Sequence, residues 1–83
     1  MATNKIMFTY NISKNADAEA FCRICSIIES SCMGLKKEAL LEDVDGTQIQ
    51  IYISNEGKIK IYNDYEVDAV YIDSDIDLKN ISL

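Results

Sequence analysis

The 83-residue sequence contains no histidine, no proline and no tryptophan, and only three glycines and three cysteines. Without histidine, the chain lacks the commonest metal ligand and the only side chain whose unperturbed pKa lies near neutral pH. It also has no G-x-S-x-G motif, no glycine-rich phosphate loop, and no serine or cysteine paired with a histidine base. The sequence therefore predicts a protein that is not an enzyme, with no catalytic residue and no cofactor.

Two segments resemble metal sites only in part. Cys22-Arg23-Ile24-Cys25 forms a C-x-x-C pattern with Cys32 seven residues later, but a zinc site takes four ligands and the chain has no fourth cysteine. Asp73-Ser74-Asp75-Ile76-Asp77 resembles the start of a calcium loop, but Leu78 stands where the sharp turn requires glycine. We therefore expect no metal site and free cysteines in the reducing cytoplasm. A thiol- or metal-dependent small protein is the alternative from a different functional class.

Long hydrophobic runs are absent as well. No apolar run approaches the roughly 20 residues of a transmembrane helix, and the first five residues do not resemble a signal peptide. Hydrophobic residues make up 48% of the chain and charged residues 27%, which is the balance of a folded globular domain. The abundance of Ile, Asn, Lys, Asp and Tyr is typical of AT-rich coding sequences. We expect one acidic domain over residues 1–83, in the cytoplasm of a bacterial host cell.

The negative charge is concentrated in the second half of the chain. Of the net charge of −6, residues 1–41 contribute +1, whereas residues 42–83 carry ten carboxylates and three lysines and contribute −7. Such a surface repels nucleic acid and anionic membranes and attracts basic proteins. We therefore expect no direct binding to nucleic acid or membrane, and a partner with a basic surface.

The first part of the chain predicts a strand followed by a helix. Alternation over Lys5 to Ile12 predicts a strand whose core face carries Ile6, Phe8, Tyr10 and Ile12. A helix is predicted over residues 16–33, with Asn15 or Ser13 as N-cap and Gly34 as C-cap. Its apolar stripe repeats at three- and four-residue spacing. The stripe comprises Phe21, Ile24, Cys25, Ile28, Cys32 and Leu35.

Isoleucines alternate with polar residues from Thr47 to Asn63 and predict a β-hairpin. A three-residue loop, Asn55-Glu56-Gly57, would pair Ile53 with Ile59 because Gly57 would take the left-handed conformation. A two-residue loop would shift the register by one residue and split the apolar face. The alternation places Ile49, Ile51, Ile53, Ile59 and Ile61 in the core, and Gln48, Gln50, Tyr52, Lys58, Lys60 and Tyr62 on the exposed face.

The remaining segments complete an α+β fold. A second turn at Asn63-Asp64-Tyr65 would pair Ile61 with Val67 and Lys60 with Asp68. The segment 35–42 has helical propensity and predicts a short second helix, with a strand that enters another hairpin as the alternative. The segment 73–83 would add an edge strand or pack across the sheet. We expect an antiparallel sheet of about four strands, formed by the N-terminal strand and a C-terminal meander, on one main helix.

Carboxylates and tyrosines of the sheet half are the candidate partner-binding residues. Carboxylates on a rigid sheet dock on a surface lined by Lys and Arg and can take the place of phosphates, and tyrosines supply anchors that concentrate interface energy. The predicted set comprises Glu42, Asp43, Asp45, Tyr52, Tyr62, Asp64, Tyr65, Glu66, Asp68, Asp73, Asp75 and Asp77. Tyr71 would contribute in the same way. A solvated face that keeps the protein soluble is the simpler interpretation of these charges.

With its small size, acidity, α+β layout and lack of catalytic residues, the chain resembles the inhibitors made by phages and mobile elements, of which anti-CRISPR proteins are the best-known group. The resemblance is one of type and no motif carries it. It implies a non-catalytic inhibitor that blocks a basic nucleic-acid-binding surface of a bacterial defence complex by charge mimicry, as a monomer or small homodimer. An immunity protein or antitoxin that neutralises a basic nuclease toxin is the alternative, and a phage assembly protein is another.

Overall fold

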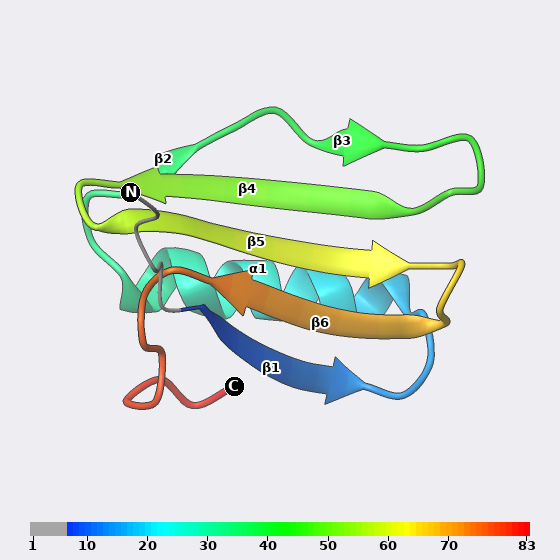
Figure 1. The fold of residues 1–83 in the computed structure, drawn as a ribbon, viewed down its shortest axis with the longest axis horizontal. Coiled ribbons are helices and arrows are strands. Elements are labelled where there is room, and N and C mark those ends of the chain that lie inside the picture. The colour runs from blue at the N-terminus through cyan, green and yellow to red at the C-terminus, as the bar shows by residue number, and fades with distance from the viewer. Residues whose placement is uncertain (1–6) are drawn as a thin grey trace, which may run out of the picture.

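A computed structural model describes residues 7–83 as an α+β fold with one helix and a six-stranded antiparallel sheet (Figure 1). The sheet has two more strands than the sequence predicted. The elements are β1 (Phe8–Ser13), α1 (Ala18–Ser31), β2 (Lys36–Lys37), β3 (Leu41–Glu42), β4 (Gln48–Ser54), β5 (Gly57–Asp64) and β6 (Ala69–Ser74). The strand order is β1-β6-β5-β4-β2, and β3 also pairs with β4. In Figure 1 the helix passes behind β5 and β6, so it packs on one face of the sheet, and within residues 7–83 the other face is open.

The expected first strand and helix are both present. Tyr10 and Ile12 of β1 pack against the core, as predicted, whereas Lys5 and Ile6 lie outside the described residues. The helix starts later than predicted, because the carboxylate of Asp17 accepts hydrogen bonds from the backbone N–H groups of Glu19 and Ala20 and is the N-cap.

The helix ends two residues earlier than predicted but buries the predicted stripe. Cys32 is the C-cap, whereas Gly34 lies two residues beyond it with a positive φ of 76°. The predicted stripe does face the sheet: Phe21, Ile24 and Ile28 are buried, and Cys25, Cys32 and Leu35 pack against them.

The hairpin of β4 and β5 forms, but its predicted register is wrong. Ser54 pairs with Gly57, so the loop has two residues, Asn55 and Glu56, and Ile53 lies opposite Lys58. Tyr52 therefore pairs with Ile59 and enters the core. Gly57 has a φ of 144°, and a Cβ atom there would lie 2.5 Å from Cβ of Asp75, so this turn requires glycine.

This register reverses the two faces of β4. Tyr52 and Gln50 are buried, with exposed fractions of 1% and 4%, although the sequence placed both outside. Ile49, Ile51 and Ile53, predicted in the core, lie partly exposed on the open face. On β5 the predicted faces are correct, because Ile59 and Ile61 are fully buried and Lys58, Lys60 and Tyr62 alternate with them.

The turn between β5 and β6 differs from the prediction as well, and is longer and later in the chain than expected. Asp64 pairs with Ala69, so residues 65–68 form the loop, and Ile61 lies opposite Ile72 instead of Val67. Lys60 does face an aspartate, but that aspartate is Asp73. The predicted register is wrong because the turn starts two residues later, at Tyr65 instead of Asn63, and has four residues instead of three.

Residues 35–42 contain two short strands where the sequence favoured a helix. Lys36 and Lys37 pair with Ile53 and Tyr52, and Leu41 and Glu42 pair with Ile49 and Gln48. The connection between these strands is held by the buried Gln50, whose Nε2 donates to the carbonyl oxygen of Glu38 at 2.6 Å. Pairing with β4 overrides the helical propensity of this segment.

The C-terminal segment packs against the core beyond β6. Leu78 is 1% exposed, and Ile76 and Ile81 contact the buried cluster. The backbone N–H of Leu78 donates to the hydroxyl oxygen of Tyr10 at 2.8 Å, which fixes the segment beside β1. The second of the two predicted arrangements, packing without a further strand, is the one observed.

Candidate protein-binding surface

Three loops that are far apart in the sequence meet at one end of the sheet. They connect β1 to α1 (residues 14–17), β3 to β4 (43–47) and β5 to β6 (65–68), and all lie at the right of Figure 1. We call this end, together with the adjoining residues 18–19, 42 and 64, the acidic end. Its carboxylates are Asp17, Glu19, Glu42, Asp43, Asp45, Asp64, Glu66 and Asp68.

Hydrogen bonds tie the three loops to one another. The backbone N–H of Tyr65 donates to Oγ1 of Thr47 at 3.0 Å, which links the second loop to the third. Asp68 links the third loop to the first, since its Oδ1 accepts from the N–H of Ala16 at 2.8 Å and its Oδ2 from Nδ2 of Asn15 at 3.0 Å. The acidic end is therefore one connected surface.

A buried asparagine anchors the same end from below. Asn63 is fully buried, its Oδ1 accepts from the backbone N–H of Asp17 at 2.9 Å, and its Nδ2 donates to Oε1 of Gln48 at 3.2 Å. It thus joins the start of α1 to the middle of the sheet. A polar side chain is stable in this position because both of its hydrogen-bonding groups have partners.

The aspartates of these loops are held in fixed orientations by backbone N–H groups. Asp64 accepts from the N–H groups of Glu66 and Val67 and, through Oδ2, from the hydroxyl of Tyr71 at 2.9 Å. The backbone N–H of Thr47, followed by its hydroxyl, lowers the pKa of Asp45. The N–H of Ala16, followed by the side chain of Asn15, lowers the pKa of Asp68. Both carboxylates therefore stay ionised at neutral pH.

This end carries more negative charge than the whole molecule. Its eight carboxylates are opposed by a single cation, Lys14, which gives a local charge of −7 against −6 for the chain. The rest of the protein is therefore close to neutral. Such an asymmetric distribution concentrates the electrostatic attraction for a basic partner at one end of the molecule.

Exposed apolar side chains project from the same loops. Val44 is fully exposed, and Val67 and Tyr65 are 61% and 46% exposed. The ring of Tyr65 lies over the turn of the neighbouring loop, because a Cβ atom on Gly46 would be 3.6 Å from its Cδ2. Apolar side chains surrounded by charges are typical of protein-binding sites, in which they form the centre of the interface.

The structure brings together only part of the set predicted from the sequence. Seven residues lie at the acidic end: Glu42, Asp43, Asp45, Asp64, Tyr65, Glu66 and Asp68. Tyr62 and Asp73 lie on the open face of the sheet. Tyr52 is buried beneath α1, so it has no exposed surface for a partner.

The last two predicted carboxylates lie at the opposite end and hold the chain there. Oδ2 of Asp75 accepts from the backbone N–H of Lys58 at 3.0 Å. Oδ1 of Asp77 accepts from the hydroxyl of Tyr10 at 3.1 Å and from the N–H of Lys79. Their spacing in the sequence resembled a calcium loop, but each of them binds a different part of the protein.

Sequence reasoning missed four residues of this end: Asp17, Glu19, Val44 and Val67. In the sequence the two acids fall in the first turn of the predicted helix, and nothing local shows that this turn lies beside the turns of the sheet. The valines lie in turns, between residues of strong turn propensity. An apolar side chain in such a polar turn is the one local signal that indicates a contact outside the chain.

A second polar cluster lies on the packed face of the sheet, around Tyr52. Its hydroxyl donates to Oε2 of Glu29 at 2.5 Å, and Nζ of Lys37 lies 2.9 Å from the same oxygen. The hydrogen bond from Tyr52, followed by that from Lys37, lowers the pKa of Glu29. Glu29 in turn raises the pKa of Lys37. Burial raises the pKa of Cys25 and the pKa of Tyr52. Each of these pKa values is shifted away from neutral pH, whereas acid–base catalysis needs a pKa near the working pH. The cluster is therefore suited to holding β2 and β4 against α1.

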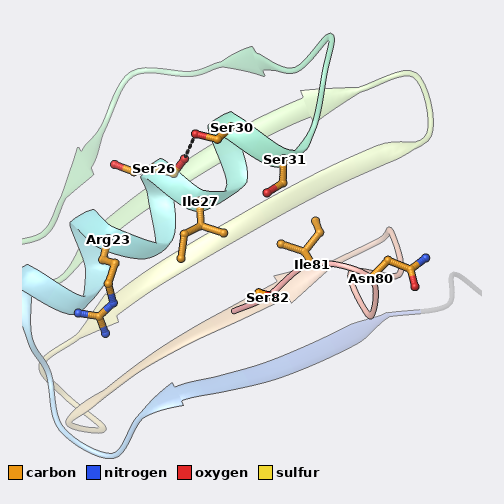
Figure 2. Close-up of a pocket in the computed structure, with 8 residues that line it drawn as sticks. All are labelled: Arg23, Ser26, Ile27, Ser30, Ser31, Asn80, Ile81 and Ser82. Atoms are coloured by element: carbon orange, nitrogen blue, oxygen red, sulfur yellow. Dashed lines mark hydrogen bonds between the residues drawn. The ribbon is translucent and has the colours of Figure 1, made fainter.

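A groove lies between α1 and the C-terminal segment and has a volume of about 660 Å³. In Figure 2, Ile27 of α1 and Ile81 of the C-terminal segment lie on its two sides, with Arg23 at one end. Ser26, Ser30 and Ser31 also line it, and the hydroxyl of Ser30 donates to the carbonyl oxygen of Ser26 at 2.9 Å. Its only charged lining residue is Arg23, so the groove has no pair of acid and base.

Metal-ligating side chains do not converge within residues 7–83, where no group of three or more His, Cys, Asp or Glu is placed to hold an ion. The three cysteines are free; Cys22 is exposed, and Cys25 and Cys32 are partly buried. In the same part of the chain, no helix is long and apolar enough to cross a membrane.

Comparison with family models, with curated proteins and with solved structures finds no match to this chain.

Proposed function

We propose that this protein is a non-catalytic inhibitor whose acidic end binds a basic nucleic-acid-binding surface of a bacterial defence complex of the CRISPR type. Bound there, it excludes nucleic acid from that surface. One observation carries the proposal: three hydrogen-bonded loops and the residues that adjoin them present eight carboxylates and three exposed apolar side chains as a single surface.

The electrostatics of the acidic end support competition with nucleic acid. A groove lined by Lys and Arg for phosphates attracts any anion, and an acidic protein surface competes with the phosphates for the same cations. The local charge of −7 leads the partner to this end, because the rest of the molecule is close to neutral. Association of this kind is fast and weakens as salt is added.

Rigidity and the apolar side chains supply the rest of the binding energy. The aspartates are already oriented by backbone N–H groups, so little conformational entropy is lost when they bind. Val44, Tyr65 and Val67 provide apolar area that carboxylates alone lack. Apolar and aromatic anchors surrounded by charges concentrate most of the energy of a protein interface.

The proposal is tested by measuring target-DNA binding by purified, guide-RNA-loaded effector complexes, one of each CRISPR type, with and without the protein. We expect at least one complex to lose DNA binding. Glu19, Glu42 and Glu66 suit the test, because within residues 7–83 their carboxylates make no hydrogen bond or ion pair, so neutralising them leaves the loops intact. The triple change Glu19→Gln, Glu42→Gln and Glu66→Gln should weaken inhibition by about 3- to 150-fold, since each exposed charge contributes about 0.2–1 kcal/mol.

The matched control is Glu56→Gln, which removes an exposed carboxylate from the β4–β5 turn at the opposite end of the sheet. Its inhibition should stay within about twofold of the unchanged protein, since surface charges this far apart are screened from each other at physiological salt. Absence of inhibition in every complex, or equal losses in the triple variant and the control, would show the proposal to be wrong.

A further inference from the structure

A row of large apolar side chains crosses the open face of the sheet next to the acidic end. The strand register places Leu41, Ile49, Tyr62 and Tyr71 side by side across β3, β4, β5 and β6. Leu41 is 50% exposed, the other three are partly exposed, and no element of residues 7–83 lies over them. We call these four residues the apolar row.

The composition of the apolar row is unusual for a solvated surface. In an antiparallel sheet with one face in water, the outward positions are normally polar, but the row has apolar or aromatic residues on four neighbouring strands. Tyr62 and Tyr71 are stacked, with ring centroids 4.7 Å apart and planes inclined by 14°. Aromatic residues are enriched at the centre of protein interfaces, so the row indicates a surface that a partner covers.

Direct contacts join the apolar row to the acidic end. The hydroxyl of Tyr71 donates to Oδ2 of Asp64 at 2.9 Å, and Oδ1 of the same aspartate accepts from two backbone N–H groups of the β5–β6 loop. At the other side of the sheet, Leu41 directly precedes Glu42 in β3. The row and the acidic end are therefore neighbouring parts of one surface.

The charges of the open face set the limit of that surface. Within residues 7–83, the lysines of this face are Lys36, Lys58 and Lys60, and all three lie beyond the row, on the side away from the acidic end. A basic partner is attracted to the acidic end and repelled by these lysines. Its contact with the open face therefore ends at the row.

We propose that the basic partner bound by the acidic end also packs against the apolar row. This proposal rests on the proposed function and adds the chemistry of the partner surface, which must carry apolar or aromatic side chains beside its Lys and Arg residues. Grooves that bind single-stranded nucleic acid have this combination, because cations hold the phosphates and aromatic side chains stack on the bases. The acidic end then takes the place of the phosphates and the row takes the place of the bases.

Inhibition of single-stranded target-DNA binding by the affected guide-RNA-loaded effector complex tests this proposal. Ile49→Thr keeps a branched residue suited to a strand and should weaken inhibition about 5- to 30-fold, as loss of an interface anchor does. Leu41→Thr changes a half-exposed residue, so the fold tolerates it, and it should weaken inhibition by a similar factor. Both losses should persist at 500 mM salt, because salt screens charges and not apolar contacts.

The matched control is Ile53→Thr, which makes the same change on the same strand and face, but between Lys36 and Lys58. It should leave inhibition within about twofold of the unchanged protein. Equal losses for Ile49→Thr and Ile53→Thr would overturn the proposal. Full inhibition by both Leu41→Thr and Ile49→Thr, or inhibition of duplex binding alone, would overturn it as well.

Failure of this proposal can be distinguished from failure of the proposed function. If the triple glutamine variant inhibits weakly while Leu41→Thr and Ile49→Thr inhibit fully, the acidic end binds the partner without the row. If no effector complex loses DNA binding, both proposals are wrong. A mass of twice 9.4 kDa for the protein alone in sedimentation equilibrium, reduced to 9.4 kDa by Ile49→Thr, would assign the row to a second copy and overturn this proposal.

Discussion

The register of β4 can be tested by measuring protein stability, because its neighbouring residues face opposite sides of the sheet. Tyr52 is 1% exposed and lies beneath α1, whereas Ile51 faces outward and is only partly buried. The alternation of isoleucines predicts the reverse. Replacing each residue by alanine therefore distinguishes the observed register from the one expected from sequence.

The expected losses in the free energy of unfolding differ several-fold between Tyr52→Ala and Ile51→Ala. Truncating a buried aromatic side chain to alanine costs about 3–5 kcal/mol, so Tyr52→Ala should lower the free energy of unfolding by this amount. Ile51→Ala should lower it by about 1 kcal/mol, because much of the apolar contact is already absent on the open face. Tyr52→Phe removes only the hydroxyl group, which donates to Glu29, a partly exposed partner, and should also cost about 1 kcal/mol.

The measurement is urea unfolding followed by circular dichroism, at a protein concentration below which the midpoint no longer changes. Under that condition self-association does not contribute to the loss in Ile51→Ala. At about 4–8 °C per kcal/mol for a domain of this size, Tyr52→Ala should lower the melting temperature by at least about 12 °C. A larger loss for Ile51→Ala than for Tyr52→Ala would refute the register and the packing derived from it.

Two further changes test the supports of the acidic end and of the hairpin. Asn63→Ala leaves the backbone N–H of Asp17 and Oε1 of Gln48 without their partner. It should therefore lower the free energy of unfolding, measured by chemical denaturation, by about 2–4 kcal/mol. The control Asn11→Ala, on the exposed face of β1, should lower it by less than about 0.5 kcal/mol. Gly57→Ala forces a Cβ atom against Asp75 and requires a positive φ, so it should cost about 1–3 kcal/mol. A thermal midpoint unchanged by Gly57→Ala would contradict the two-residue turn.

Local periodicity predicted the elements that depend on local contacts. The stripe of α1 follows from spacing alone, and Phe21, Ile24 and Ile28 are buried as expected. On β5 the alternation also gave the correct face, because Ile59 and Ile61 pack directly beneath the helix. In these segments the apolar residues lie on the packed side, so the pattern and the structure agree.

The same reasoning failed where distant polar contacts decide the packing. Gln50 is buried because it holds the carbonyl of Glu38, and Tyr52 because its hydroxyl reaches Glu29. These partners lie 12 and 23 residues away in the sequence, so no local pattern shows them. Alternation identified β4 as a strand, but its isoleucines could not show which face would be covered.

The candidate site was predictable in charge but not in shape. The sequence shows acidic turns around Asp43 and around Asp64, and the structure places them at one end of the sheet. The structure also shows that the carboxylates of segment 73–77 lie outside the acidic end, whereas those at the start of α1 belong to it. These placements depend on the order and register of the strands, which composition and local spacing do not show.

The salt dependence of inhibition tests the role of the acidic end most directly. The concentration for half-inhibition of target-DNA binding by the affected effector complex should be measured at 50 and 500 mM salt, for the unchanged protein and for the triple glutamine variant. We expect the variant to be about 3- to 150-fold weaker at 50 mM, with most of this difference lost at 500 mM, where the Debye length falls to about 4 Å. A difference that persists at high salt, or no difference at low salt, would contradict electrostatic binding through the acidic end.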